Sequence, residues 1–387
     1  MCRISKDKVD SYFQDLLGAH NDNIRAEYEN PDPEVQEGID SSFNPAVTPT
    51  EALHYLSSMN YDSAAGSDKV SIKILRDVDQ QGEIMAAIWT VCLPNARLPN
   101  SMKEARTVLL PKSGDLDELA SWRGISICSA IRRCVSKVVN ARLEQYVELS
   151  EHQKGFYRLP GLLENVNRLE GILKASKESH RKVCVWFLDI SKAFDNVCHK
   201  HIERTLPLYA IPEHLRKTGI SFYEDASTTI ECSNGRTDAV TVRRGVLQGD
   251  PLSPLLFNIC NDFVLQDLNR ECIRSKYGFT VNGDLALTVF AFADDLVIVT
   301  CDRKSMEIIS SDIVNKLRSI GLAVNQKKSK FLETDGKGYV SEELLDVPDC
   351  GQIAALSATE KVEYLGVVQH NLQFNLGEEI WFFHQTG

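Results

Sequence analysis

Hydrophobic and polar positions along the chain predict a mixture of helices and short strands. Some apolar residues recur at helical spacing, and others form β-branched or aromatic runs bounded by turn residues. We predict helices at residues 49–56, 69–75, 126–149, 252–273 and 304–320, and strands at residues 106–112, 183–188, 227–231, 239–242, 285–291, 296–299 and 322–332. This order predicts an α+β fold in which helices pack on one face of a small antiparallel sheet.

One predicted hairpin carries two adjacent carboxylates, Asp294 and Asp295, at its tip. Neighbouring carboxylates repel, and partial burial removes their water, so such a pair is unfavourable unless a cation meets it. A third carboxylate, Asp189, closes the strand predicted at residues 183–188. We predict that Asp294 and Asp189 bind two Mg²⁺ ions, with Asp295 in a supporting role and the Ile190 carbonyl as a further ligand. An isolated aspartate can equally be a cap or turn residue, so spacing alone leaves both interpretations open.

A second dense signal is the glycine- and proline-rich segment at residues 245–254. Glycines such as Gly249 let a backbone approach a ligand closely, Gln248 can hydrogen-bond a base or backbone edge, and the prolines can open a helix. The alternative interpretation is a tight connection between a strand and a helix.

Composition fits an intracellular globular protein. The chain has 387 residues, of which 43% are hydrophobic and 25% charged, which predicts two or three subdomains with a substantial core. No apolar run is long enough to span a bilayer and no secretory signal is evident, so we expect it in the nucleus or cytoplasm, neither secreted nor membrane-bound. The eleven cysteines show no disulfide or zinc spacing, and we interpret them as buried small apolar residues.

The net charge of −11 at first argues against nucleic-acid binding. The two ends of the chain, residues 1–45 and 341–387, carry net charges of −6 and −7, which leaves +2 for residues 46–340. Only the ends are acidic, so the middle of the chain can still present a basic groove.

Three segments closely resemble polymerase motifs of reverse transcriptases from non-LTR (LINE-type) retrotransposons: residues 188–195, 245–258 and 291–296. The resemblance extends in order over residues 46–370. Residues 321–330 resemble the next palm motif, and residues 363–367 resemble the primer grip. Segments similar to fingers motifs lie upstream, at residues 65–68, 110–115, 121–126 and 155–165. Residues 226–229, with the Leu-Glu-Asn element at 163–165, favour the site-specific lineage that carries a restriction-like endonuclease.

The resemblance implies a right-hand polymerase with fingers and palm that extends a DNA 3′ end on an RNA template. Its partners would be the RNA template, a DNA primer and dNTPs, and its cofactor two Mg²⁺ ions, for which Mn²⁺ can substitute. We predict an acidic, partly disordered lead-in at residues 1–45, a fingers-like region at 46–182, a palm at 183–340 and a primer-grip-like segment with a truncated tail at 341–387.

The resemblance also implies roles for single residues that bind the nucleotide. Phe194 occupies the steric-gate position, where a ring beneath the sugar leaves no room for a 2′-hydroxyl. Lys112 and Arg123 match positions near the triphosphate, where fixed positive charge stabilises the transition state. Taken alone, Phe194 could be a core aromatic residue, and most isolated lysines and arginines are simply solvated. Gln248 and Gly249 complete the predicted substrate-binding set.

Two further roles concern pyrophosphate release and the primer. Lys328 is a candidate general acid for pyrophosphate, with Lys327 and Lys330 as adjacent alternatives. The predicted primer grip consists of Tyr364, Leu365 and Gly366.

Some features depart from the family pattern. Gly124 stands where proline is usual, and Leu247 where arginine is frequent. The last residues do not resemble a helical thumb, so we expect the thumb to be largely absent and the chain to be a truncated or separated polymerase segment. An alternative function is a catalytically silent remnant that at most binds RNA. A maturase-type or prokaryotic retroelement polymerase is a third possibility, but it should carry a basic helical domain after the palm.

Overall fold

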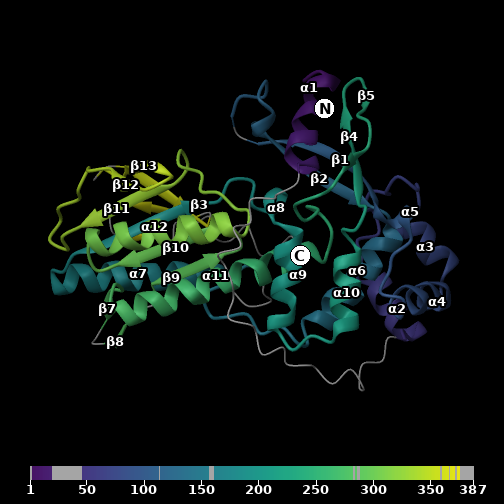
Figure 1. The fold of residues 1–387 in the computed structure, drawn as a ribbon, viewed down its shortest axis with the longest axis horizontal. Helices are drawn as coiled ribbons and strands as arrows, with labels where there is room; N and C mark the ends of the chain where they lie inside the picture. The colour runs from purple at the N-terminus through teal and green to yellow at the C-terminus, as the bar shows by residue number, and fades with distance from the viewer. Residues whose placement is uncertain are drawn as a thin grey trace. The chain divides into compact units, whose positions relative to one another are not determined.

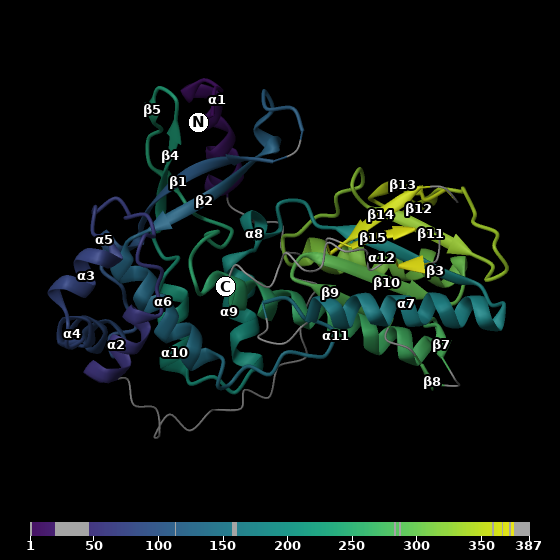
Figure 2. The ribbon, with the colours of Figure 1, turned by 180° about the vertical axis from the view of Figure 1, so that it is seen from behind.

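The fold is described from a computed structural model (Figure 1 and, from behind, Figure 2). It describes residues 2–19, 46–112, 114–156, 161–281, 284–285, 288–357, 360–365, 367–370 and 373–374. Within these ranges, no helix combines the length and the apolar character that crossing a membrane requires.

The chain folds into two compact units, each built from two stretches of sequence. The first unit comprises residues 1–148 and 192–260, and the second comprises residues 149–191 and 261–387. The boundaries of these units differ from those of the predicted lead-in, fingers-like, palm and primer-grip-like regions. The boundaries of the predicted regions stay a prediction.

The first unit contains a sheet with strand order β2-β1-β4-β5, in which β6 also pairs with β4. Its strands are β1 (Glu104–Pro111), β2 (Trp122–Cys128), β4 (Ser227–Cys232), β5 (Gly235–Arg236) and β6 (Val240–Thr241). β1 pairs antiparallel with β2 and parallel with β4. The strand predicted at residues 106–112 and the hairpin strands predicted at 227–231 and 239–242 are thereby confirmed.

Helices accompany this sheet in the first unit. They are α2 (Pro49–Ser57), α3 (Ile72–Val78), α4 (Glu83–Cys92), α5 (Asn100–Lys103), α6 (Ala130–Leu143), α8 (Ala193–Asn196), α9 (His199–Thr205) and α10 (Glu213–Ser221). The helix predicted at residues 126–149 is too long at both ends. Residues up to Cys128 pair with β1 instead, and Ser129 caps α6 by accepting the Ile131 N–H.

The predicted lead-in contains ordered structure close to its start. α1 (Lys6–Phe13) continues into a π-helical turn at Gln14–Gly18. Val9, Phe13 and Leu16 recur at helical spacing and are buried, so this segment packs into the first unit. Residues 20–45 lie outside the described residues.

The second unit is built on a six-stranded sheet of order β12-β13-β11-β3-β10-β9. Its strands are β3 (Val183–Asp189), β9 (Val289–Phe292), β10 (Asp295–Thr300), β11 (Lys330–Thr334), β12 (Leu345–Val347) and β13 (Gly351–Ala355). All pairings are antiparallel except β11 with β13. Smaller sheets join β7 (Thr280–Val281) with β8 (Asp284–Leu285), and β14 (Lys361–Tyr364) with β15 (Val367–His370) and β16 (Gln373–Phe374). The predicted acidic-tipped hairpin is confirmed.

The core of the second unit lies between the sheet and α7 (Gly161–Ser179). Val166, Leu169 and Leu173 of α7 pack with Val185 and Val297 of the central strands. Burying each such side chain contributes roughly 1.5–3 kcal/mol. α12 (Arg303–Ser319) also belongs to this unit, and α11 (Ser253–Ser275) begins in the first unit and ends in the second. The helices predicted at residues 252–273 and 304–320 and the α+β class are therefore confirmed.

Two sequence expectations have different outcomes. The strand predicted at residues 322–332 is wrong over most of its length, because β11 begins at Lys330 and residues before it form turns that bond to the end of β3. The interpretation of the cysteines holds for nine of the eleven, which are free and buried.

Candidate active site

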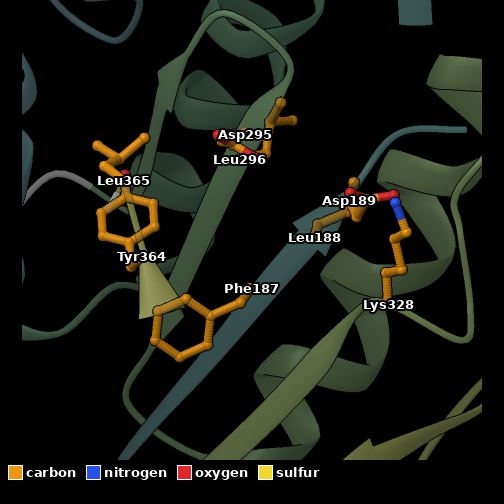
Figure 3. Close-up of a pocket in the computed structure, with 8 residues that line it drawn as sticks. All are labelled: Phe187, Leu188, Asp189, Asp295, Leu296, Lys328, Tyr364 and Leu365. Atoms are coloured by element: carbon orange, nitrogen blue, oxygen red, sulfur yellow. The ribbon is translucent and has the colours of Figure 1, made fainter. Parts of the chain in front are cut away.

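A pocket in the second unit lies where β3 ends and β10 begins (Figure 3). It has a volume of about 260 Å³. Its lining residues are Phe187, Leu188, Asp189, Asp295, Leu296, Lys328, Tyr364 and Leu365. Five of the predicted site residues therefore surround one pocket.

The sheet register sets the two carboxylates of this pocket against each other. Asp189 and Asp295 are direct partners in the antiparallel pairing of β3 with β10. Side chains of such partners project from the same face, with Cβ atoms about 4.5–5.5 Å apart. Asp294 lies in the turn between β9 and β10, next to Ala293, whose φ of 56° is left-handed. Which of Asp294 and Asp295 is the stronger ligand stays a prediction.

The electrostatics of the pocket favour a bound cation. The pKa of the Asp295 carboxyl is raised from 3.8 to about 6, first by desolvation and then by the charges of Asp294 and Asp189. Lys328 opposes this rise. The Asp295 side chain still reaches solvent, so a ligand can approach it although protein surrounds much of it. These mutually repelling carboxylates form a concentrated negative site.

Lys328 reaches the pocket because its loop is hydrogen-bonded to the end of β3. The Asn325 N–H donates to the Asp189 carbonyl at 2.8 Å, and the Asp189 N–H donates to Ser329 Oγ at 3.1 Å. Figure 3 shows the Lys328 side chain extending toward Asp189. Lys330, one predicted alternative, instead pairs with Glu360 at 3.0 Å. Of the three neighbouring lysines, Lys328 is the one that lines the pocket.

The predicted primer-grip residues form another wall of the pocket. The rings of Tyr364 and Phe187 meet edge to face, with centroids 5.9 Å apart. Burial, and secondarily the charge of Asp295, raise the pKa of the Tyr364 hydroxyl. Leu365 follows with a φ of 53°, while Gly366 lies outside the described residues.

Sequence reasoning missed Gln153, which grips the hairpin tip. Its Nε2 donates to the Ala293 carbonyl at 3.1 Å, and its Oε1 accepts the Ala293 N–H at 2.8 Å. Gly155 allows this approach, because a Cβ there would lie 2.2 Å from the Ala293 nitrogen. The only signal in the sequence is that Gln153 precedes the glycine of a recognised motif. A buried amide outside any periodic pattern is not otherwise detectable.

The remaining site residues lie in the first unit, and we call Lys112, Arg123, Phe194, Gln248 and Gly249 the predicted nucleotide surface. Phe194 belongs to α8, and its ring stacks on the buried Phe257, with centroids 4.8 Å apart and planes 10° from parallel. Such an offset or stacked pair of aromatic rings restricts both side chains. Phe257 thus fixes the orientation of the predicted gate.

Gln248 is held through its side chain and its backbone. Its Nε2 donates to Asp195 Oδ1 at 3.1 Å, and its carbonyl accepts the Ser126 N–H at 2.7 Å. Desolvation raises the pKa of Asp195, while the Gln248 hydrogen bond, Lys192, Lys112 and Arg244 act to lower it. The carboxylate therefore orients the Gln248 amide.

A buried ion pair anchors the loop that carries Gln248 and Gly249. Arg132 Nε lies 2.8 Å from Asp250 Oδ2, and both side chains are 0% exposed. Gly249 adopts a φ of 110°, and a Cβ there would meet the Ser126 carbonyl at 2.8 Å. This contact explains the need for glycine, because the loop lies against the edge of β2.

The β1–β2 hairpin brings the two predicted triphosphate-binding cations to one end of its sheet. Arg123 pairs with Leu110, and Lys112 follows β1 and donates its N–H to the Ser121 carbonyl at 2.7 Å. Both side chains are exposed. Their binding roles stay predictions.

A divalent cation fits the chemistry of the pocket. Among the described residues, no three His, Cys, Asp or Glu side chains are gathered tightly enough to hold a metal ion. Asp189 and Asp294 are nevertheless close enough to Asp295 to raise its pKa. The available donors are carboxylate oxygens, which Mg²⁺ prefers.

Several proteins with sequences similar to this chain come from retrotransposons. A family model described as Reverse transcriptase (RNA-dependent DNA polymerase) matches residues 110–369. A Pol polyprotein from the type-1 retrotransposable element R2 of Popillia japonica is 33% identical over 279 residues, 72% of this chain and 38% of that protein. One from the type-2 element R2DM of Drosophila melanogaster is 29% identical over 315 residues, 80% of this chain and 29% of that protein. The resemblance to the site-specific non-LTR lineage is confirmed, and the chain spans less than two fifths of these relatives.

Among solved structures, a similar one is a telomerase from Candida tropicalis in complex with the TWJ fragment of telomeric RNA. The TM-score is 0.50 at 12% sequence identity, and the match covers 80% of this chain and 49% of that chain. At this identity the likeness concerns the fold, and it agrees with the predicted fingers and palm.

Proposed function

Because this chain belongs to the reverse transcriptase family, we propose that it is an RNA-directed DNA polymerase that extends a DNA 3′ end on an RNA template. The observation that carries the proposal is the pairing of Asp189 with Asp295 beside a pocket that Lys328 also lines. Its proposed partners are an RNA template, a DNA primer and dNTPs.

Reverse transcriptases use divalent metal ions. In this chain, two Mg²⁺ ions would be held by the carboxylates of Asp189, Asp294 and Asp295 and the carbonyl of Ile190, with Mn²⁺ as a substitute. When bound, such ions activate the attacking hydroxyl and stabilise the leaving pyrophosphate. The raised pKa of Asp295, caused first by desolvation and then by the charges of Asp294 and Asp189, supports this assignment.

The other residues of the second unit would handle the leaving group and the primer. Lys328 extends into the pocket, where its ammonium group can give a proton to the pyrophosphate. Tyr364 and Leu365, on the wall beside Asp295, would position the primer end. Gly366, the third predicted primer-grip residue, lies outside the described residues.

The predicted nucleotide surface of the first unit would bind the incoming dNTP. The exposed cations Lys112 and Arg123 would bind its triphosphate. Phe194, held by Phe257, would exclude a 2′-hydroxyl, and Gln248 with Gly249 would contact the nucleotide.

The test is primer extension by the purified chain on an RNA template. Wild type should incorporate dNTPs in a magnesium-dependent reaction, and Asp294→Asn should abolish incorporation. Asp346→Asn, an exposed aspartate on β12, is the matched control and should behave as wild type.

The polymerase function would be contradicted if folded wild type incorporated no more dNTP than Asp294→Asn does. If the same preparation still bound RNA in a filter assay, the alternative of a catalytically silent RNA-binding remnant would take its place.

A further inference from the structure

The N-terminal helix, which we define as α1 with its π-helical turn, contacts three segments that carry the predicted nucleotide surface. The Lys192 ammonium lies 4.3 Å from the centre of the Tyr12 ring. The Arg244 guanidinium donates to the carbonyls of Asp15 and Leu16. A Cβ built on Gly124 would lie 3.6 Å from the Phe13 ring. Lys192 precedes Phe194 by two residues, Arg244 precedes Gln248 by four, and Gly124 follows Arg123.

The end of this helix is capped by the loop that leads to Gln248. The last carbonyls of a helix have no partner within it and carry partial negative charge. Arg244 Nη2 lies 2.8 Å from the Asp15 carbonyl, and the Arg243 N–H donates to the Leu17 carbonyl at 2.9 Å. A cation and an N–H from consecutive residues thus satisfy the helix end. The contact fixes the loop as well as the helix.

The same helix fixes the segment before the gate. Lys192 adopts a φ of 46°, which is left-handed and unusual for a lysine, at the start of α8. The cation–π contact with Tyr12 gives its side chain a defined place. Gly124, a departure from the family pattern, lies close to the same helix: a Cβ there would be in ordinary contact with the Phe13 ring at 3.6 Å, and in a tight contact of 3.1 Å with the Thr107 methyl group.

The gate segment and the Gln248 loop are bonded to each other. The Val246 N–H donates to the Phe194 carbonyl, and the Gly245 N–H donates to the Val197 carbonyl, both at 2.7 Å. A Cβ on Gly245 would lie 2.6 Å from the Asp195 carbonyl oxygen, so only glycine permits this approach. The N-terminal helix therefore clamps two bonded segments from one side.

We propose that the N-terminal helix is a positioning element for nucleotide selection, holding Lys192 and Arg244 so that Phe194 and Gln248 keep a fixed relative position. The inference rests on the proposed polymerase function. It assigns a role to the N-terminal helix, for which the sequence alone indicated no function.

The test compares Tyr12→Ala and Arg244→Ala with Tyr12→Phe and with Lys8→Ala, an exposed position on the same helix. Tyr12→Ala should raise the KM for dNTPs roughly two- to fivefold and reduce the preference for dNTPs over rNTPs, with kcat unchanged. Arg244→Ala should raise this KM on the order of tenfold. Tyr12→Phe keeps the ring and should restore wild-type values, as should Lys8→Ala.

Amide hydrogen exchange supplies a readout that needs no catalysis. Exchange at residues 194–197 and 243–246 should accelerate in Tyr12→Ala and Arg244→Ala, but not in Lys8→Ala, while β1 stays protected. The inference is overturned if Tyr12→Ala matches Lys8→Ala in KM and exchange, or if kcat alone falls together with thermal stability. Wild type without any incorporation would contradict the polymerase function instead, and the exchange comparison would still decide whether the helix positions these segments.

Discussion

The pocket of the second unit and the predicted nucleotide surface of the first unit are held by different kinds of contact. Asp189 and Asp295 face each other because the backbones of two strands are in register. Phe194 and Gln248 lie in a short helix and a loop, and they depend on side chains from elsewhere in the first unit, Phe257 and Asp195. The carboxylates should therefore tolerate changes around them better than the nucleotide surface does.

Arg132→Ala should give the largest effect on stability and would sharpen this contrast. It leaves Asp250 buried without its partner and should lower the free energy of unfolding by about 3–5 kcal/mol. Urea denaturation followed by tryptophan fluorescence measures the change. Arg204→Ala, an exposed position on α9, is the control and should change stability by less than about 0.5 kcal/mol. Equal stabilities of the two variants would mean that the ion pair does not anchor the loop.

Gln153→Ala tests whether strand pairing alone holds the acidic hairpin tip in place. It removes both hydrogen bonds to Ala293 and should lower stability by about 1–3 kcal/mol. In primer extension kcat should fall while the KM for dNTPs is retained, because the nucleotide surface is untouched. Gln352→Ala, exposed on β13, is the matched control. A rise in KM without a fall in kcat would contradict the role of Gln153 at the tip.

Phe194→Val probes the nucleotide surface directly. Removing the ring should reduce discrimination against rNTPs on the order of 10- to 100-fold. The measurement is the ratio of kcat/KM for a dNTP and its rNTP counterpart. Discrimination that stays at the wild-type value would reject the gate.

The smallest effect concerns the Asp295 carboxylate in the metal-free pocket, which is disfavoured first by desolvation and then by the charges of Asp294 and Asp189. The pKa of Asp295 is about 6 in the folded chain against an ordinary value of 3.8, so the folded state binds this proton more tightly. The contribution of Asp295 to stability should therefore fall as pH rises from about 4 to 6, and remain lower above that range. With metal chelated, Asp295→Asn should have a higher melting temperature than wild type at pH 8. At pH 4 the two melting temperatures should be equal. A difference independent of pH would exclude ionisation of Asp295 as its cause.

The contrast between strand register in the second unit and side-chain contacts in the first unit also explains which features the sequence could predict. β3 and the β9–β10 hairpin were predictable because unbroken apolar runs end in aspartates, so chain position alone brings Asp189 and Asp295 to strand ends. In the first unit, the prediction failed at the boundary between β2 and α6. Residues 122–128 form a strand that joins directly to α6, and a short apolar run does not distinguish strand from helix.

Contacts between distant residues were also beyond the sequence. The stacking of Phe194 on Phe257 and the grip of Gln153 on Ala293 depend on tertiary structure and leave no periodic signal. The polar composition of the first 45 residues likewise concealed the few apolar positions that bury α1. The roles of the site residues stay predictions until they are measured.

The most direct test of the central claim is a single-turnover measurement of one dNTP added to a primer on an RNA template. Wild type and Asp346→Asn should extend the primer at equal, magnesium-dependent rates, whereas Asp189→Asn should leave it unextended with the template and primer still bound. Extension by Asp189→Asn at the wild-type rate would show that the pocket between β3 and β10 is not where the reaction occurs.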